Sequence, residues 1–457
     1  MVVVLVLQLL LGLRVQSAAA QHHRTHARQA LNVYGCPVHN YPYAVKQFAQ
    51  LVARAPFLQH QFEDGAAVDA GQLSRQVANF TFAASSFVTQ YLSKVGPING
   101  QRPHVLTLDC SKPKFSSILS GTKRQAPAKI VWASRFSFES YLLVFRLHTY
   151  KDLVDNFFIS ESSRVAYTGT PKPLIYEHMK HHFLEFVENI THHVLDDTTW
   201  RRQFSWRNGT SSADTGDVWA NEAQHHDAIY RELPKQFAGW SDSDLVVYGD
   251  MDEMADEDLL LHLKHCQLRP DLREPINSNT VMWLGDYRYM FRSDWPPSSA
   301  FRYSLRFPTV WTLGTVRKGS PQNPTTPLEL RDYKSAGSHP TEPGGWHLSY
   351  TLYAPTLYLK YIGMAELGVV RMAKLWHITD VHRHLAAQRN VSTLLTGREA
   401  WRKRVPHPDC VLRDHPAYKN VTLQVPWLVA QNVQAFAFWA PCEPAFYDLD
   451  PAAAECV

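Results

Sequence analysis

The sequence lacks the patterns of several protein classes. None of its 6 cysteines has C-x-x-C spacing, so zinc and thioredoxin-like sites give way to disulfides, whose pairing the sequence leaves open. Lys and Arg (46) nearly balance Asp and Glu (42) and do not cluster, which gives no argument for nucleic-acid binding. After the first 20 residues or so, no segment is apolar over the roughly 20 residues that a membrane span needs. The 457 residues, 45% of them hydrophobic, instead suit a globular protein of one or two domains.

The amino terminus carries a targeting pattern. Residues 2–13 are apolar apart from Gln8 and Gly12, and a run of small residues follows at 17–20. This pattern predicts a secretory signal over residues 1–20, either cleaved or retained as a short membrane anchor. The chain also contains N-x-S/T sequons, and together with the signal they place the remaining residues in the lumen of the secretory pathway. The sequons begin at Asn79, Asn189, Asn208, Asn390 and Asn420.

The strongest indication of function is an apolar run that ends in two carboxylates. Residues 245–248 (Leu-Val-Val-Tyr) precede Gly249, Asp250 and Asp252, as expected for a buried strand that leads to a ligand site at the edge of an open α/β sheet. Because side chains alternate along an extended backbone, we expect both carboxylates to face one Mg²⁺ or Mn²⁺ ion, with a nucleotide diphosphate as its other ligand. The three acids at 256–258 are expected to begin a helix, where the helix dipole favours anions.

The rest of the chain divides into regions of different composition and hydrophobic pattern. Residues 21–128 contain His- and Gln-rich stretches and end in a linker-like segment at 111–129. We expect residues 21–128 to form a stem or accessory segment. From residue 130 onward, strands and helices alternate, which predicts an open α/β sheet in a domain over residues 129–440, with a tail at 441–457. We expect strands at 130–132, 156–160, 245–248, 280–283, 286–291 and 309–313, and helices at 138–150, 219–233 and 255–263.

Several stretches of this domain occur in a characteristic order. They are Phe138-Glu139 with Arg146, Leu153 to Glu161, Tyr167 to Leu174, Gly249 to Glu253, and Gly345 to Tyr350, with a weaker one at Val425 to Leu428. Together they resemble glycosyltransferase family 17, the family of the bisecting N-acetylglucosaminyltransferase type, over about residues 129–440.

The resemblance implies a GT-A-like fold that binds a nucleotide sugar. It also implies inverting transfer of N-acetylglucosamine from UDP-GlcNAc to a mannose of an N-glycan, with Mn²⁺ or Mg²⁺ as cofactor. The partners would be the UDP-GlcNAc donor and a glycoprotein acceptor. The location would be the Golgi lumen, with membrane contact only through an N-terminal anchor.

The candidate metal and catalytic residues lie in two of these stretches and in one later segment. Asp252 is the expected metal ligand, and Asp250 is expected to contact the metal or the ribose. Glu253 is either the general base that takes the proton of the acceptor hydroxyl or a structural partner of a neighbouring amide. By the resemblance, His347 or His377 would complete the metal shell, and a structural histidine is the alternative for each.

Other candidates would bind the donor or the acceptor. Glu161, at the end of the second expected strand, is a candidate to accept hydrogen bonds from uracil or ribose, while Asp155 is expected to cap or to pair with Arg146. Lys172 would either meet phosphate or lie in an exposed loop. Aromatic residues would stack on acceptor sugars, with core packing as the competing explanation. This aromatic set comprises Trp283, Tyr287, Trp295 and Trp346.

Other functions stay open at this stage. The same fold could use another UDP-sugar or acceptor, or it could be a secreted carbohydrate-binding protein that has lost turnover. The intact pair of Asp250 and Asp252 argues against a pure binder, which has no need to neutralise a diphosphate. A metal-dependent phosphoesterase would need more His and Asp ligands, for two metals, than surround Asp250.

Overall fold

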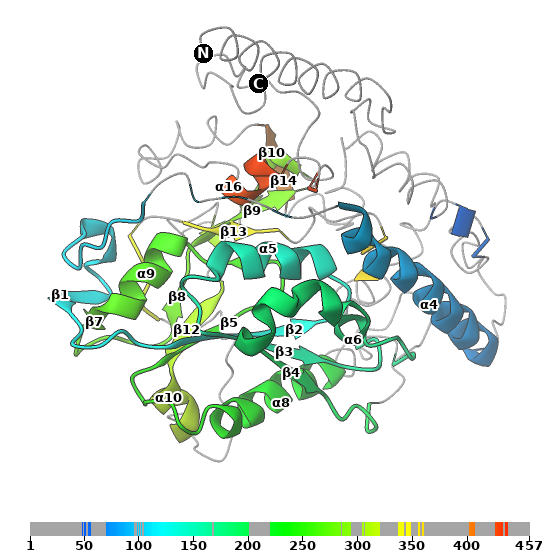
Figure 1. Cartoon of the computed structure of the whole chain (residues 1–457), viewed down its shortest axis with the longest axis horizontal. Coiled ribbons are helices and arrows are strands. Elements are labelled where there is room, and N and C mark those ends of the chain that lie inside the picture. The colour runs from blue at the N-terminus through cyan, green and yellow to red at the C-terminus, as the bar shows by residue number, and fades with distance from the viewer. Residues whose placement is uncertain are drawn as a thin grey trace, which may run out of the picture.

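Figure 1 shows the computed structural model of the chain, in which a central sheet lies between helices. The expected signal at 1–20, the tail at 441–457, Trp295 and His377 lie outside the residues that the structure describes. The described residues are 48, 50–51, 54–55, 70–95, 98, 100, 102, 105–166, 169–200, 220–284, 286–293, 304–305, 307–319, 337–341, 344–348, 355–356, 359–360, 402–406, 426–432 and 435–436.

The central sheet has six strands in the order β4-β3-β2-β5-β12-β8. Strands β4, β3, β2 and β5 are parallel to one another, whereas β12 is antiparallel to both β5 and β8. The sheet is therefore mixed and is compatible with a GT-A-like α/β fold. Its strands are β4 (Ile190–Val194), β3 (Asn156–Glu161), β2 (Ile130–Phe136), β5 (Leu245–Tyr248), β12 (Thr309–Thr312) and β8 (Ile276–Asn277).

Both faces of this sheet are covered, which explains why its inner strands are continuous apolar runs. On β2, Ile130 and Trp132 pack on the face that carries α5 (Ser140–Tyr150), while Val131 and Ala133 pack on the face that carries α8 (Ala220–Gln236) and α10 (Leu313–Lys318). Figure 1 shows α5 above the sheet and the other two helices below it. The expected strands and helices of this region are confirmed, except that the last strand ends at Thr312 because Leu313 begins α10.

The helix after the acidic residues is also confirmed. This helix, α9 (Glu257–His265), is capped by Asp256, whose side chain accepts a hydrogen bond from the amide of Asp258. It leads into β7 (Cys266–Leu268), which pairs with β1 (Leu119–Lys123). A disulfide between Cys110 and Cys266 fixes this pair of strands to the preceding segment and confirms the expectation of disulfide bonding.

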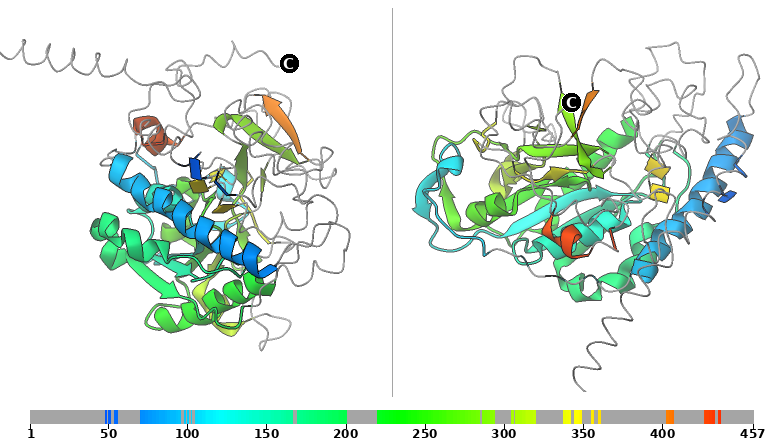
Figure 2. Two further views of the ribbon diagram at one scale, coloured as in Figure 1. Left: turned by 90° about the vertical axis from the view of Figure 1, so that its right-hand side faces the viewer. Right: turned by 90° about the horizontal axis from the view of Figure 1, so that it is seen from above.

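A long helix, α4 (Ala70–Val95), lies within the segment that we expected to form a stem. Its buried side chains belong to the same hydrophobic core as α5. The Ser140 hydroxyl at the start of α5 donates to the Val88 carbonyl of α4 at 3.1 Å, and the rings of Tyr91 and Tyr141 meet edge to face. Figure 2 shows α4 running along the side of the domain. Sequence analysis did not predict this helix.

A second sheet lies beyond the end of β5, in the order β14-β10-β9-β13-β6, with β11 paired to β9. Its short strand β13 is antiparallel to β6 and parallel to β9. The strands expected at 280–283 and 286–291 are confirmed as β9 and β10. The bounds are β6 (Glu253–Met254), β9 (Thr280–Leu284), β10 (Asp286–Ser293), β11 (Ser304–Leu305), β13 (Trp346–His347) and β14 (Arg402–Pro406).

Short helical segments complete the described structure. They are η1 (Pro113–Phe115), α6 (Ile175–Met179), η2 (Lys180–Asn189) and α16 (Trp427–Gln431). Within the described ranges, no helix combines the length and the apolar character needed to cross a membrane.

Candidate functional site

The acidic motif lies where the central sheet meets the second sheet. Strand β5 ends at Tyr248, which is paired with Ala133 of the parallel strand β2, and the chain then enters β6 at Glu253. The expectation that Asp250 and Asp252 follow the carboxyl end of a buried strand is therefore confirmed. Gly249 allows the close approach there, because a Cβ at this position would lie 2.7 Å from both Glu253 Oε2 and Pro308 Cβ.

The backbone of this motif forms a turn. The amide of Glu253 donates to the carbonyl of Asp250 at 3.0 Å, and the amide of Asp250 donates to Glu253 Oε2 at 2.8 Å. The expected extended backbone through residues 250–252 is therefore wrong, since the hydrogen bonds close a turn before β6 begins. Alternation along a strand no longer directs Asp250 and Asp252 to one side, and the two carboxylates have different partners.

Arg146 of α5 holds this turn from the core. Its Nη2 donates to the carbonyls of Asp250 at 2.6 Å and Glu253 at 3.1 Å, and its guanidinium lies 4.5 Å from the ring centroid of Trp132. Burial lowers the pKa of Arg146 to about 10, which leaves the side chain charged at neutral pH. The expected pairing of Asp155 with Arg146 is wrong.

Asp155 lies just before β3, at the amino ends of the parallel strands, whereas the acidic turn follows the carboxyl end of β5. Its carboxylate accepts from the amide of Ile130 and from Nζ of Lys264, each at 2.8 Å. Asp155 therefore caps the start of β2.

His347 reaches the acidic turn through strand pairing. Within the second sheet, His347 of β13 is opposite Glu253 of β6, and the amide of Leu348 donates to the carbonyl of Asp252 at 2.7 Å. Gly345 makes the pairing feasible, because it has a φ of 81° and a Cβ there would collide with the carbonyl of Met254. As a result, ligand atoms of Asp252, Glu253 and His347 all lie within 4.8 Å of one another.

Asp252 is buried and has basic groups on both oxygens. Lys360 Nζ lies 2.6 Å from its Oδ2, and His347 Nε2 lies 3.8 Å from its Oδ1. Burial alone would raise the pKa of Asp252, but the charges of Lys360 and His347 outweigh burial and lower this pKa to about 2. Sequence analysis missed Lys360, which lies 108 positions from Asp252 with no motif around it.

Asp250 belongs to a separate, neighbouring network. Arg135, at the end of β2, contacts Asp250 Oδ1 at 2.8 Å through Nη2 and Glu222 Oε1 of α8 at 2.8 Å through Nη1. Burial would raise the pKa of Glu222, but Arg135 more than offsets it and the pKa falls to about 2. Glu222 also lies 3.7 Å from His226 Nε2, and His226 Nδ1 contacts the hydroxyl of Tyr248.

Sequence analysis missed Arg135 as well. Its position at the carboxyl end of an expected strand, next to the strand that precedes Asp250, could have identified it.

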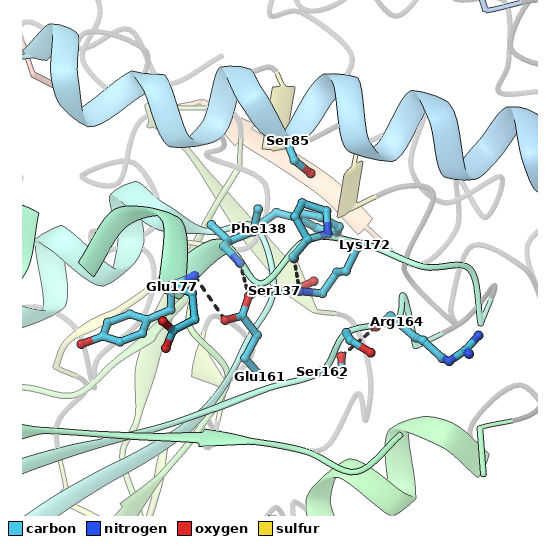
Figure 3. A network of polar contacts seen from close by, with 12 residues as sticks. Ser85, Ser137, Phe138, Glu161, Ser162, Arg164, Lys172 and Glu177 are labelled. Atoms are coloured by element: carbon cyan, nitrogen blue, oxygen red, sulfur yellow. Dashed lines mark hydrogen bonds and ion pairs between the residues drawn. The ribbon is translucent and has the colours of Figure 1, made fainter. Parts of the chain in front are cut away.

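Glu161 and Lys172 contact each other below α4, as Figure 3 shows for the polar network around them. Glu161 is the last residue of β3 and is fully buried. It accepts from the amides of Ile175 at 2.6 Å and Tyr176 at 3.2 Å and from Lys172 Nζ at 3.1 Å. The side chain of Lys172 is likewise fully buried, so the alternative of an exposed loop is wrong. These contacts are structural, and nucleotide binding by this pair stays a prediction.

The described aromatic candidates lie on three strands of the second sheet. Trp346 of β13 is half-buried and meets the ring of Phe145 edge to face, with centroids 6.5 Å apart. Trp283 lies on β9 and Tyr287 on β10. Stacking of these residues on an acceptor sugar stays a prediction.

The donor set of the acidic turn suits a divalent cation. Carboxylate oxygens are preferred by Mg²⁺ and Mn²⁺, and imidazole nitrogen by later transition metals, so Asp252, Glu253 and His347 together could hold a metal ion. Asp250 is not part of this group. Strand β13 pairs with β6 on one side and with β9 on the other, and the Leu348 amide holds the Asp252 carbonyl, which positions the donors before any ligand binds.

Comparison with known proteins finds a family match for part of the chain. Residues 84–302 match the model of glycosyltransferase family 17, a range that begins within α4 and includes the acidic turn. His347 and Lys360 follow the matched range. No curated protein and no solved structure matches the chain. The match to glycosyltransferase family 17 thus covers residues 84–302, a little under half of the 457 residues.

Proposed function

We propose that the chain is an inverting, metal-dependent transferase that moves N-acetylglucosamine from UDP-GlcNAc to a mannose of an N-glycan. The family match supports glycosyl transfer in N-glycan biosynthesis. The observation that carries the proposal is the cluster of Asp252, Glu253 and His347 beyond the carboxyl end of β5. This is the edge of an open α/β sheet at which ligands bind.

The residues of the turn would act together on the donor. Asp252 and His347 would hold the cation, with Glu253 beside them, and a bound divalent cation would supply positive charge for the departing diphosphate. Arg146 holds the carbonyls of the turn, so Asp252 is oriented before the donor arrives and little reorganisation is needed when charge develops.

Glu253 has the structural contact that was one of its two expected roles. The hydrogen bond from the Asp250 amide to Glu253 Oε2, together with complete burial of Glu253, supports a role in shaping the turn. Asp250 would orient Arg135, whose guanidinium lies at the carboxyl end of β2, where a donor phosphate or ribose would be within reach.

The covalent chemistry of the chain supports a lumenal compartment. The disulfide between Cys110 and Cys266 is typical of an oxidising lumen. The sequon at Asn79 lies on an exposed position of α4, where an oligosaccharyl group would meet no core residue. These features support a location in the secretory pathway, and we propose the Golgi lumen from the family match.

The test is UDP release by the full chain, purified from the secretory pathway of expressing cells. A panel of UDP-sugars is offered with a mixture of N-glycan acceptors, in Mn²⁺ or in chelator. We expect release from UDP-GlcNAc alone, and only with the metal. Release from a different UDP-sugar would show that UDP-GlcNAc is not the donor. If folded protein releases UDP from no donor, a carbohydrate-binding protein without turnover is favoured.

A further inference from the structure

A lysine ammonium lies against the acid that is best placed to bind a metal. Lys360 Nζ is 2.6 Å from Asp252 Oδ2, and the side chains of both residues are largely buried, with 14% and 4% of their surfaces exposed. The separation of 2.6 Å and the shared burial are those of a close ion pair.

The position of the ammonium is also a position for a metal. A Mg²⁺ or Ca²⁺ ion lies about 2.0–2.6 Å from a carboxylate oxygen, so it would occupy the space that Lys360 Nζ now occupies next to Oδ2. A metal ion in that place would overlap the ammonium, and the two positive charges would repel each other. His347 approaches the other oxygen, Oδ1, at 3.8 Å, so only the Oδ2 side of Asp252 carries this conflict.

We propose that Lys360 is the resident counter-ion of Asp252 and that a divalent cation must displace its ammonium in order to bind. The inference rests on the metal site of the proposed function. The apparent metal affinity is then the intrinsic affinity multiplied by the fraction of molecules in which the ion pair is open. The ion pair also neutralises the negative charge of the buried Asp252 carboxylate while no metal is bound, because an unpaired buried charge is strongly destabilising. Lys360 thereby acts as a positioning residue that sets the metal affinity of the site.

The experiment is a titration of the full chain with Mn²⁺, followed by electron paramagnetic resonance, without nucleotide. The variant is Lys360→Gln, which is neutral but can still donate a hydrogen bond to Asp252. We expect Lys360→Gln to bind Mn²⁺ at least about tenfold more tightly than the wild type, because an ion pair populated in about nine molecules of ten reduces affinity by that factor. Lys360→Arg, which keeps the charge, should stay within about twofold of the wild type.

The ion pair of Lys264 and Asp155, at the amino ends of the parallel strands, provides a matched control. Lys264 pairs with Asp155 at 2.8 Å, and its side chain is 15% exposed, close to the value for Lys360. Lys264→Gln removes a comparable ion pair away from the acidic turn and should leave the Mn²⁺ affinity unchanged.

A second measurement on the wild type does not depend on any variant folding. Saturating Mn²⁺ should speed acetylation of Lys360 by acetic anhydride, as followed by mass spectrometry, because the displaced amine leaves its carboxylate partner. The rate at Lys264 should not change. An unchanged or slower rate at Lys360 would overturn the proposal.

The outcomes separate this inference from the proposed function. Equal or weaker Mn²⁺ binding by folded Lys360→Gln, with metal-dependent transfer in the wild type, overturns the inference alone. Transfer that persists in chelator also overturns it, while the transferase assignment stands. If the wild type neither binds Mn²⁺ nor turns over any UDP-sugar, both fall together.

Discussion

Substitution of Arg146 by Met tests whether one buried side chain holds the acidic turn. The guanidinium donates to the carbonyls of Asp250 and Glu253 and contacts the Ser134 hydroxyl. Met is similar in length and can still pack against Trp132, so the substitution removes the donors while most of the volume is retained. Its effect should therefore report the hydrogen bonds more than a cavity.

The expected loss of stability follows from the backbone carbonyls that lose their hydrogen-bond donor. A hydrogen bond from a charged donor contributes about 1.5–3 kcal/mol, and a buried acceptor without a partner carries a similar cost. The desolvation of the guanidinium, which also disappears, offsets part of this loss. We expect Arg146→Met to lower the free energy of unfolding by about 3–5 kcal/mol, the range for breaking a buried charged contact. Because the turn positions Asp252, Mn²⁺ affinity should fall by about 10- to 100-fold, as for other outer-shell partners.

Urea unfolding followed by tryptophan fluorescence measures the first quantity, and an Mn²⁺ titration measures the second. The matched control is Arg317→Met, because Arg317 also donates to backbone carbonyls, those of Phe237, Ala238 and Trp240. It lies on α10 below the sheet and is partly exposed, so a smaller loss of stability with unchanged Mn²⁺ affinity is expected. Arg146→Met protein with wild-type stability, or with reduced stability but wild-type Mn²⁺ affinity, would refute the reasoning.

Other substitutions test further parts of the account. Gly345→Ala should weaken Mn²⁺ binding and cost about 1–3 kcal/mol, whereas Gly121→Ala, at a φ of 86° with nothing within 4 Å, should leave Mn²⁺ binding unchanged; equal affinity in both would contradict the role of β13. Replacing Cys110 and Cys266 by Ser opens a loop with a sequence separation of 156 and should cost up to about 5 kcal/mol in urea unfolding; an unchanged midpoint would show that the bridge contributes nothing. The pKa of Asp252 falls from 3.8 to about 2 on folding, so its contribution of about 2 kcal/mol is present above pH 3.8 and is lost as the pH falls through about 2. Asp252→Asn should lack this part of the acid dependence of stability, and identical pH profiles would refute it.

The sequence predicted most of the central sheet because the physical pattern there is local. The runs that became β2, β3 and β5 are apolar on both faces, which only a covered sheet requires. Helix α4 escaped detection for the opposite reason. Its buried face mixes Val77, Phe80 and Val88 with the buried polar residues Thr81 and Ser85, so the apolar periodicity that marks a helix is diluted.

The site was only partly readable for reasons of distance along the chain. Asp252 could be found because it follows a buried strand, and His347 because it lies in a stretch that resembles the family. Lys360 has neither mark, since only the folded chain brings it to Asp252. The turn at 250–253 could not be inferred from alternation, because the hydrogen bond from the Asp250 amide to Glu253 replaces the extended backbone.

The most direct test of the central claim compares Asp252→Asn with Asp256→Asn in the UDP-release assay with saturating UDP-GlcNAc, acceptor and Mn²⁺. Asp256 lies in the same acidic stretch but caps α9, and Asn is an equally good N-cap residue, so Asp256→Asn should transfer at nearly the wild-type rate. We predict that Asp252→Asn, confirmed as folded by its circular dichroism spectrum, loses at least about 100-fold in rate, or about 2.7 kcal/mol of transition-state stabilisation. A folded Asp252→Asn protein that transfers sugar at the rate of Asp256→Asn would contradict the claim that this carboxylate is the centre of the site.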